Sequence, residues 1–362
     1  MIAIVVIAGC YQLLSILACL RWIFSPRDQP AAPVPVSVLK PIRGLDDEFL
    51  AAIRSQAAQD HPNFEILFGI TDPADSARAE IERLTAEFPR ISIRLLTCST
   101  LAPNAKVGVL IDLASAARHS CLVVNDSDIT VEPDYLRRVT APLSDPSIGL
   151  VTCLYRAEAS DWPSRWEALG IATDFAPSAL VAPMFGVSEF GLGSTLAFRR
   201  EDLAAIGGFA SLADYIADDY QLGARIHKLG RRNLLSRVVV STRLSAGSWG
   251  GAFKHQLRWA RTIRLSRLGG FLGLPVTFAT LWAVDAAIFG HWIGALALLG
   301  IRMLAALTGG WFVLRSRAAL RDLWLVPLRD LWGVSVWVAA LFGDTVEWRG
   351  KRLRLDRQGR IV

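Results

Sequence analysis

The sequence predicts an α/β domain that is flanked in the chain by membrane segments, one before it and others after it. Three observations lead to this fold class. Strand-like and helix-like segments alternate through the centre of the chain, an uncharged apolar run opens it, and its last third is rich in apolar residues. The 362 residues are 52% hydrophobic, and most of that hydrophobicity lies in the two outer regions. The centre therefore has the composition of an ordinary folded domain.

The apolar run at the N-terminus, residues 1–20, contains no charged residue and ends at Arg21. About 20 apolar residues are enough for a helix to cross the ~30 Å core of a bilayer. A cleaved signal peptide would carry its basic residues before the apolar run, whereas Arg21 and Arg27 follow it. We therefore expect an uncleaved anchor over 1–24, a Pro-rich linker over 25–35, and a domain on the cytoplasmic side.

The C-terminal membrane region, residues 270–343, predicts two spans, 271–290 and 291–314. A third apolar segment, 323–343, contains an adjacent arginine and aspartate. A charge near the bilayer centre costs at least ~2.5 kcal/mol, so we expect this segment to be re-entrant or interfacial. That arrangement keeps the basic tail, 344–362, in the cytoplasm.

The net charge of +6 is explained by arginines that flank the apolar segments. The expected partner is therefore a lipid bilayer and not a nucleic acid. The five cysteines show no C-x-x-C pair and no zinc spacing, and we interpret them as buried apolar side chains.

The central domain, predicted over 36–250, alternates strands with helices, which indicates a parallel sheet covered on both faces. The predicted strands are 36–39, 64–70, 91–96 and 121–124, and the predicted helices are 46–59, 73–88 and 106–118. Ligands bind beyond the carboxyl ends of such strands, where Lys40, Asp72 and Asp126 stand. No G-x-G-x-x-G motif follows the first strand, which argues against a dinucleotide enzyme.

Asp126 and Asp128 lie two residues apart on a turn that leaves a buried strand. Mg²⁺ usually takes one or two carboxylates together with phosphates and water, so this pair suits a nucleotide diphosphate held through Mg²⁺ or Mn²⁺. The alternative is a simple turn, because Asp and Ser favour turns. Asp72 is similar: it could bind a nucleotide, or it could only begin a helix at Pro73.

Asp218 and Asp219 precede a helix-like run over 220–229. Acidic residues there can cap a helix, or one of them can be the general base that deprotonates an acceptor hydroxyl. Two adjacent carboxylates point in different directions and cannot share that task, and we favour Asp219 as the base.

The segment 251–269 predicts an amphipathic helix at the membrane surface. Its arginines recur every third residue, and from Arg261 onward we expect them to meet lipid headgroups. Arg258, beside Trp259, instead offers a forked donor to a diphosphate. Lys106 could meet the same negative charge as a point cation.

Taken in order, these motifs resemble the D, D-x-D, D, (Q/R)-x-x-R-W signature of processive and lipid-directed family 2 glycosyltransferases, which have the GT-A nucleotide-diphospho-sugar transferase fold. The residues that carry the resemblance are Asp72, Asp126 with Asp128, Asp219, and Arg258 with Trp259. The anchor and the C-terminal apolar block look most like ceramide glucosyltransferases. Three longer stretches look closest to the bacterial hopanoid branch, whose members add N-acetylglucosamine to bacteriohopanetetrol: 103–108, 124–129 and 218–223.

The resemblance implies a role for each matching residue. It implies that the nucleotide is contacted by Lys40, Asp72, Lys106 and Asp126, and that a metal is held by Asp128 with Asp126. It implies that Asp219, beside Asp218, is the base, and that Arg258 and Trp259 lie near the diphosphate and the acceptor. The acceptor pocket would be lined by Gly193, Ser194 and Thr195. One position departs from the signature, because His255, followed by Gln256, stands where the final motif has Gln or Arg. An imidazole can still donate to a phosphate.

We therefore predict an inverting glycosyltransferase at the cytoplasmic face of a bacterial inner membrane. Its donor would be UDP-N-acetylglucosamine and its acceptor bacteriohopanetetrol. The nearest alternative is ceramide glucosyltransferase activity with UDP-glucose. A polysaccharide synthase would need more membrane helices for a channel, and a receptor or transporter subunit would not need carboxylates at successive strand ends.

Overall fold

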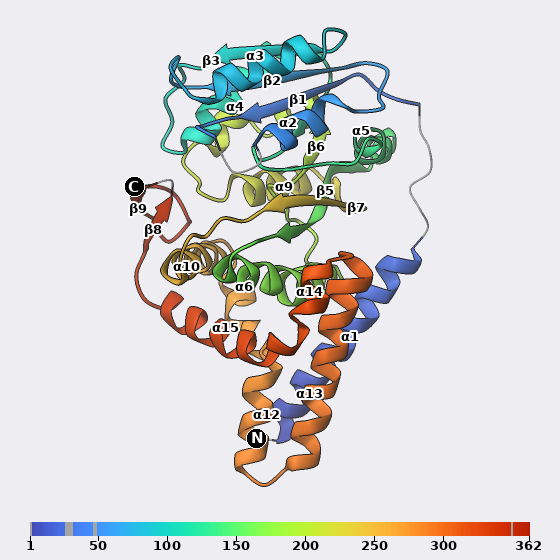
Figure 1. The fold of residues 1–362 in the computed structure, drawn as a ribbon, viewed down its shortest axis with the longest axis vertical. Helices are drawn as coiled ribbons and strands as arrows, with labels where there is room; N and C mark the ends of the chain where they lie inside the picture. Colours follow the sequence, from blue (N-terminus) through green and yellow to red (C-terminus); the bar gives the residue numbers. More distant parts are fainter. Residues whose placement is uncertain (1, 26–31, 46–48, 349) are drawn as a thin grey trace.

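A computed structural model describes residues 2–25, 32–45, 49–348 and 350–362. Residues 26–31 of the predicted linker and 46–48 of the first predicted domain helix lie outside the described residues. Figure 1 shows a sheet domain at one end of the molecule, a bundle of apolar helices at the other, and a layer of helices between them.

The core of the sheet domain is a seven-stranded sheet with the order β3-β2-β1-β4-β6-β5-β7. The strands are β1 (Val36–Pro41), β2 (Phe64–Ile70), β3 (Ser92–Thr97), β4 (Cys121–Val124), β5 (Ile148–Glu158), β6 (Leu196–Arg199) and β7 (Arg232–Arg243). The first four are mutually parallel, as predicted. β6 runs antiparallel to both β4 and β5, so the sheet is parallel-dominated and not wholly parallel.

Successive residues of the central strands enter two different apolar cores, one on each face of the sheet. Val38 belongs to one cluster and Leu39 to the other, because neighbouring side chains of a strand point to opposite faces. The helices that cover the sheet are α2 (Phe49–Ala57), α3 (Ala77–Glu87), α4 (Ala105–Ala116), α5 (Tyr135–Thr140), α8 (Arg200–Ala205) and α9 (Asp218–Lys228), with the 3₁₀ turns η1 (Ala141–Ser144) and η4 (Phe209–Leu212). Burial on both faces explains why the central strands, such as β2 and β4, are largely apolar runs without alternation.

A long helical segment, Trp162–Phe185, lies between the sheet and the bundle. It comprises α6 (Trp162–Gly170), the π-helix η2 (Ile171–Phe175), α7 (Ala176–Val181) and the 3₁₀ turn η3 (Ala182–Phe185). This segment is not among the helices predicted from the sequence. The other elements of this layer are α10 (Trp249–Ser266), α14 (Arg317–Arg321), η7 (Leu323–Leu325) and α15 (Val326–Ala340).

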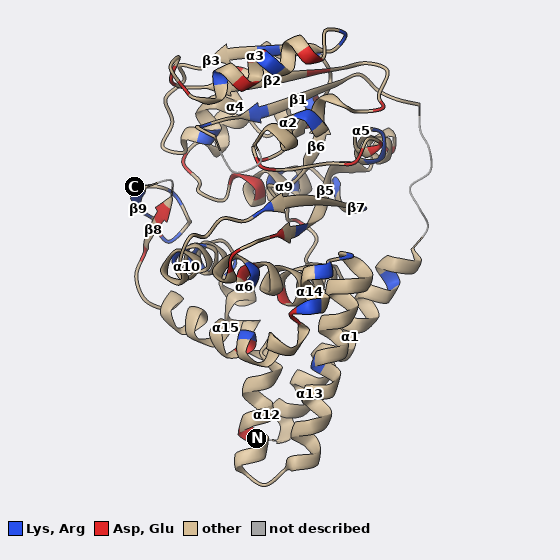
Figure 2. Cartoon of the chain, viewed as in Figure 1, with Lys and Arg blue, Asp and Glu red and all other residues tan. Residues whose placement is uncertain are grey.

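The apolar bundle consists of elements from both ends of the chain, namely α1 (Ile2–Phe24), α11 (Leu268–Gly273), η5 (Leu274–Thr277), α12 (Ala279–Ile288), α13 (Trp292–Leu307) and the π-helix η6 (Thr308–Val313). Among the described residues, four helices are long and apolar enough to cross a membrane: Ile2–Phe24, Trp162–Phe185, Trp292–Val313 and Leu323–Ala340. The span predicted over 271–290 is bent by 52° between η5 and α12, and the segments Leu268–Thr277 and Ala279–Ile288 are together apolar enough to cross a membrane as one broken span. Figure 1 shows α15 lying across the direction of the bundle, and Figure 2 shows few charged residues on α1, α12 and α13.

The charged residues inside the apolar C-terminal region are paired within the protein. Arg302 of α13, 2% exposed, donates to Asp330 of α15 over 2.7 Å and also pairs with Asp174 of η2. Asp330 accepts a further hydrogen bond from the hydroxyl of Thr280 over 2.7 Å. This network joins α12, α13, α15 and η2 at one point, so Asp330 does not face lipid.

The arginines that follow Arg258 also bind inside the protein. Arg261 donates to the carbonyl of Phe342 over 2.8 Å, and Arg264 donates to the carbonyl of Leu341 over 2.6 Å. Arg267 pairs with Glu189. The prediction that these arginines meet lipid headgroups is therefore wrong for these contacts: two of them cap the end of α15, where helix carbonyls lack partners.

The predicted basic tail is folded. β8 (Thr345–Trp348) and β9 (Lys351–Arg354) form an antiparallel pair, and the residues after it return to the sheet domain. The N–H of Ile361 donates to the carbonyl of Asp214 over 2.7 Å, and Leu355 packs with Ile216 in a small apolar cluster. These apolar contacts were not predicted, because charged residues are frequent in the segment.

Candidate active site

Three carboxylates gather around Lys106 beyond the carboxyl end of β4; we call Asp126, Asp218, Asp219 and Lys106 the acidic cluster. Lys106 Nζ lies 2.8 Å from Asp126 Oδ1 and 3.3 Å from Asp218 Oδ2. Burial works to lower the pKa of Lys106, but the charges of Asp126, Asp218 and Asp219 outweigh it and raise that pKa. Lys106 therefore remains a cation and neutralises part of the cluster.

Lys106 reaches this place because α4 begins one residue before it. Asn104 caps the helix, and its side-chain oxygen accepts from the backbone N–H groups of Lys106 and Val107. Its amide nitrogen donates to the carbonyl of Tyr215 over 2.7 Å. One side chain thus ties the start of α4 to the loop before α9.

Lys40 lies beneath the turn that carries Asp126 and is fully buried. Its Nζ donates to the backbone carbonyl of Asp126 over 2.6 Å. Burial lowers the pKa of Lys40 to about 8, against the opposing charges of Asp128 and Asp126. The expected contact between Lys40 and the nucleotide is therefore wrong, because the side chain has no exposed surface. Lys40 instead stabilises the turn that carries Asp126.

Asp128 leans toward β7, where one carboxylate oxygen accepts from the hydroxyl of Thr242. Burial, followed by the charge of Asp126, raises the pKa of Asp128. A cation beside the two carboxylates would offset the repulsion between their charges. Among the described residues, no group of three or more His, Cys, Asp or Glu side chains is arranged to hold a metal. A pair of carboxylates still suits Mg²⁺ or Mn²⁺ that completes its shell with phosphates and water.

Asp218 and Asp219 form the first turn of α9, which begins two residues earlier than predicted. Asp218 faces Lys106 and Asn104. Asp219 turns the other way, and its Oδ2 accepts from the backbone N–H of Gly193 over 2.9 Å. Burial and the charge of Asp218 raise the pKa of Asp219 to about 6, although Lys106 opposes them.

Of the three residues expected at the acceptor pocket, only Gly193 faces the acidic cluster. A Cβ atom on Gly193 would lie 3.0 Å from Asp126 Oδ2 and 3.4 Å from Asp219 Oδ2. Ser194 donates to the carbonyl of Cys153 over 2.8 Å, and the Thr195 hydroxyl donates to the carbonyl of Ser194 over 2.7 Å. Both of these side chains are buried in the sheet, which corrects the expectation that they line a pocket.

α10 brings the final motif toward the acidic cluster. Burial lowers the pKa of Arg258, and the charges of Asp126, Glu167 and Asp219 oppose that effect, so Arg258 lies within the field of the cluster. Within the part of the chain that the structure describes, no hydrogen bond or ion pair holds the Arg258 guanidinium. The Trp259 ring packs against His255 with 4.6 Å between ring centroids.

Gln256 does not face the cluster. It is buried, and its side-chain oxygen accepts from Arg329 over 3.0 Å and from Trp332 over 2.9 Å. The expected nucleotide contact of Gln256 is therefore wrong: it joins α10 to α15. Asp72 is exposed after β2, and its Oδ1 accepts from the N–H of Ala74 over 2.9 Å, which is the turn-forming role that the sequence left open.

Two side chains at the site were missed by sequence reasoning. Thr242 binds Asp128, and Glu167 of α6 lies 2.5 Å from His255 Nδ1. Neither belongs to a motif that a single sequence displays. Thr242 comes from the distant strand β7, and Glu167 lies in the helical segment that was not predicted.

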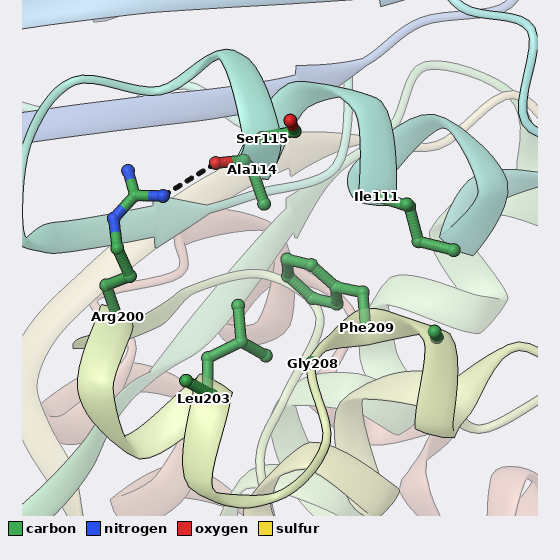
Figure 3. A pocket seen from close by; sticks show the side chains of 9 residues that line it. Ile111, Ala114, Ser115, Arg200, Leu203, Gly208 and Phe209 are labelled. Atoms are coloured by element: carbon green, nitrogen blue, oxygen red, sulfur yellow. Dashed lines mark hydrogen bonds between the residues drawn. The ribbon is translucent and has the colours of Figure 1, made fainter.

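An apolar pocket of about 260 Å³ lies apart from these residues, between α4, α8 and η4 (Figure 3). Arg200 closes one side of it by donating to the carbonyl of Ala114 over 2.7 Å. No residue of the acidic cluster lines this pocket. The chemistry suggested by the motifs therefore does not lie there.

The fold is that of a GT-A glycosyltransferase. The solved structure of a mannosyltransferase, PcManGT from Pyrobaculum calidifontis in complex with GDP-Man and Mn²⁺, has the same architecture, with a TM-score of 0.56 and 20% sequence identity. The similarity covers 94% of this chain and 97% of that chain, so it includes the membrane-side helices as well as the sheet.

The chain belongs to glycosyl transferase family 21, whose pattern matches residues 1–361. It is 24% identical to ceramide glucosyltransferase 3 of Caenorhabditis elegans, covering 90% of this chain and 74% of the relative. It is 22% identical to ceramide glucosyltransferase 1 of the same organism, covering 92% of this chain and 74% of the relative. The predicted ceramide glucosyltransferase type is confirmed, with family 21 in place of the family 2 inferred from the motifs.

Proposed function

We propose that this enzyme transfers glucose from UDP-glucose to the primary hydroxyl of a ceramide-type lipid, with inversion at the sugar carbon. The acidic cluster carries the proposal, because within the described residues Asp219 forms no direct ion pair and lies beside Asp126, which with Asp128 makes a pair suited to a metal. The sequence favoured bacteriohopanetetrol as the acceptor and ceramide as the alternative, and the relatives support ceramide better. Relatives that span 90% and 92% of the chain are ceramide glucosyltransferases.

Asp219 is the proposed general base. Lys106 pairs with both Asp126 and Asp218, and this leaves Asp219 as the carboxylate of the cluster without a direct ion pair among the described residues. Its pKa of about 6 keeps it ionised at neutral pH and still basic enough to accept a proton. In the proposed reaction, Asp219 removes the proton of the acceptor hydroxyl as that oxygen attacks the anomeric carbon.

The leaving group is a nucleoside diphosphate, whose negative charge must be met. Asp126 and Asp128 would hold Mg²⁺ or Mn²⁺, whose chemistry there is to neutralise that charge. Arg258 is the proposed second partner, because its guanidinium is within the field of the cluster and can bind phosphate oxygens in pairs.

The acceptor is proposed to stay in the membrane while it reacts. The layer of α6, α10 and α15 lies directly between the sheet domain and the apolar bundle (Figure 1). Arg21 at the end of α1 and the arginines of α14 flank the apolar helices on the side of the sheet domain. By the positive-inside rule they support a catalytic domain in the cytoplasm, here at a bacterial inner membrane.

The proposal is tested by incubating the purified chain in lipid nanodiscs with each of two donors, UDP-glucose and UDP-N-acetylglucosamine. Each donor is combined with ceramide or bacteriohopanetetrol, with Mg²⁺, Mn²⁺ or EDTA. We expect a metal-dependent glucosylceramide product, detected by mass spectrometry. The hopanoid product alone would support the acceptor implied by residues 103–108, 124–129 and 218–223. Absence of both products and of UDP release would refute glycosyl transfer to either lipid.

A further inference from the structure

A buried carboxylate supports the one position at which the final motif departs from its usual form. Glu167 of α6 is 2% exposed, and its Oε1 lies 2.5 Å from Nδ1 of His255 on α10. His255 keeps 34% of its side chain exposed. One ring nitrogen is therefore held inside the protein, while the imidazole still reaches an accessible surface.

The accessible side of His255 belongs to the same face of α10 as Arg258. Residues three apart are neighbours on a helix surface, and the Trp259 ring, 4.6 Å away, limits how the imidazole can rotate. Arg258 interacts electrostatically with Glu167, Asp126 and Asp219. Arg258 thus brings this face of α10 within the electrostatic field of the acidic cluster.

The chemistry at this position calls for a hydrogen-bond donor. Gln and Arg, the residues that usually open the motif, both donate from the side chain. An imidazole can donate as well, and with Nδ1 held by Glu167 its Nε2 is the ring nitrogen left for a ligand. Glu167 thus fixes the orientation of the imidazole, and the pair performs the task of a single Gln or Arg.

We propose that Glu167 is a positioning residue that acts through His255, holding the imidazole so that Nε2–H donates to the diphosphate of the nucleotide-sugar donor. This inference rests on the proposed function, because it places the donor between His255 and the acidic cluster. It concerns the affinity for the nucleoside diphosphate and not the proton transfer to Asp219.

Glu167 also has a second positive neighbour, which the test must separate. Arg329 of α15 interacts electrostatically with Glu167, and its Nη2 donates to Gln256. If Glu167 only balanced the charge of Arg329, its loss would weaken the layer of helices whatever residue stood at position 255.

A double-mutant cycle separates the two roles. Binding of UDP with Mg²⁺ is measured by calorimetry for the native chain, Glu167→Gln, His255→Ala and the double variant. We expect affinity to fall about tenfold for His255→Ala, as for loss of a charge-assisted hydrogen bond. Glu167→Gln should weaken binding roughly three- to tenfold in the native background and less than about twofold in the His255→Ala background.

Lys254→Ala is the matched control on the same helix. Lys254 is exposed and pairs with Glu347 over 3.0 Å, so its loss should leave UDP affinity unchanged. An equal loss of affinity from Glu167→Gln in both backgrounds would overturn the proposal, as would no loss in either. Steady-state kinetics should show the same split, with KM for UDP-glucose raised and kcat nearly kept.

A measurement on the native chain guards against a variant that does not fold. The chain has five histidines, and the ¹⁵N resonances of His255 can be assigned by their loss in His255→Ala. We expect UDP to shift the Nε2 resonance while the Nδ1 resonance stays near its starting value. An Nε2 resonance that does not respond to bound UDP overturns the proposal. A native chain that transfers no sugar but binds UDP would refute the proposed function and leave this contact measurable.

Discussion

The backbone N–H of Gly193 donates to Oδ2 of Asp219 over 2.9 Å. The proposed base is thus oriented by a main-chain group just before β6, the strand that runs antiparallel to its neighbours. The reversal of β6 brings the turn before it to the carboxyl end of β4, where the acidic cluster lies. Glycine suits this position, because a Cβ atom there would crowd the carboxylates of Asp126 and Asp219.

Replacing Gly193 with Ala should reduce the transfer rate by roughly 10- to 100-fold, because misplacement of reacting groups by about 1 Å has effects of that size. The added Cβ would lie 3.0 Å from Asp126 Oδ2 and 3.4 Å from Asp219 Oδ2. Gly300→Ala is the control, since a Cβ there meets nothing within 4 Å. Initial rates and thermal unfolding of both variants check the prediction, and equal rates would contradict it.

Replacing Asp219 with Asn should abolish transfer while UDP-glucose still binds. An amide of the same shape cannot accept the proton of the acceptor hydroxyl. The groups proposed to bind the donor, Asp126, Asp128 and Arg258, remain in place. Calorimetric binding and product formation are measured side by side, with the exposed Asp134→Asn as a control. Loss of donor binding in a folded Asp219→Asn chain would argue against the base role.

The pH dependence of the reaction should show the titration of Asp219. Burial and the charge of Asp218 raise its pKa to about 6, and only the ionised form is a base. Activity should therefore rise as the pH increases through about 6 and fall as it decreases below that value. The quantity to measure is kcat/KM for the acceptor, which reports the groups of the free enzyme. A value of kcat/KM that does not change with pH near 6 would contradict the role of Asp219 as the base.

Much of the sheet was predictable because its strands are buried on both faces. β2 and β4 have the predicted bounds, 64–70 and 121–124. The segment Trp162–Phe185 was missed, since it contains three prolines and is continued by a π-helix. Its apolar composition over 24 residues was the signal that could have found it.

The candidate site was predictable where a residue's role depends on its own loop and not where it depends on a distant partner. Asp126 and Asp219 follow from strand ends and motif order. Lys40 was misassigned because its burial depends on the turn that closes above it, 86 residues later. Arg261 was misassigned because the carbonyls it caps are about 80 residues away, at the end of α15.

Replacing Arg302 with Met should destabilise the protein by about 3–5 kcal/mol, because it leaves the buried Asp330 without its cation. The double variant Arg302→Met with Asp330→Leu should recover part of that loss, since it removes both buried charges. Thermal unfolding in detergent measures both. Equal stability of the single variant and the native chain would show that the pair does not hold α13 against α15.

Replacing Leu355 with Ala should lower stability by about 2–5 kcal/mol and reduce kcat. Leu355 packs with Ile216, which stands just before the acidic turn of α9, so a cavity there loosens the base as well as the fold. Gln358→Ala is the control, because its side chain is exposed in the same segment. A loss of stability without any change in kcat would separate the segment from the site.

The strand pair β8–β9 follows α12, α13 and α15 along the chain, yet the residues after it cover the loop that carries the proposed base. During synthesis, the sheet domain is made after α1 and before this cover. The loop before Asp218 therefore receives this support only after the apolar helices α12, α13 and α15 have been made. Chain order thus makes the last support of the proposed base depend on a segment that lies beyond the apolar helices.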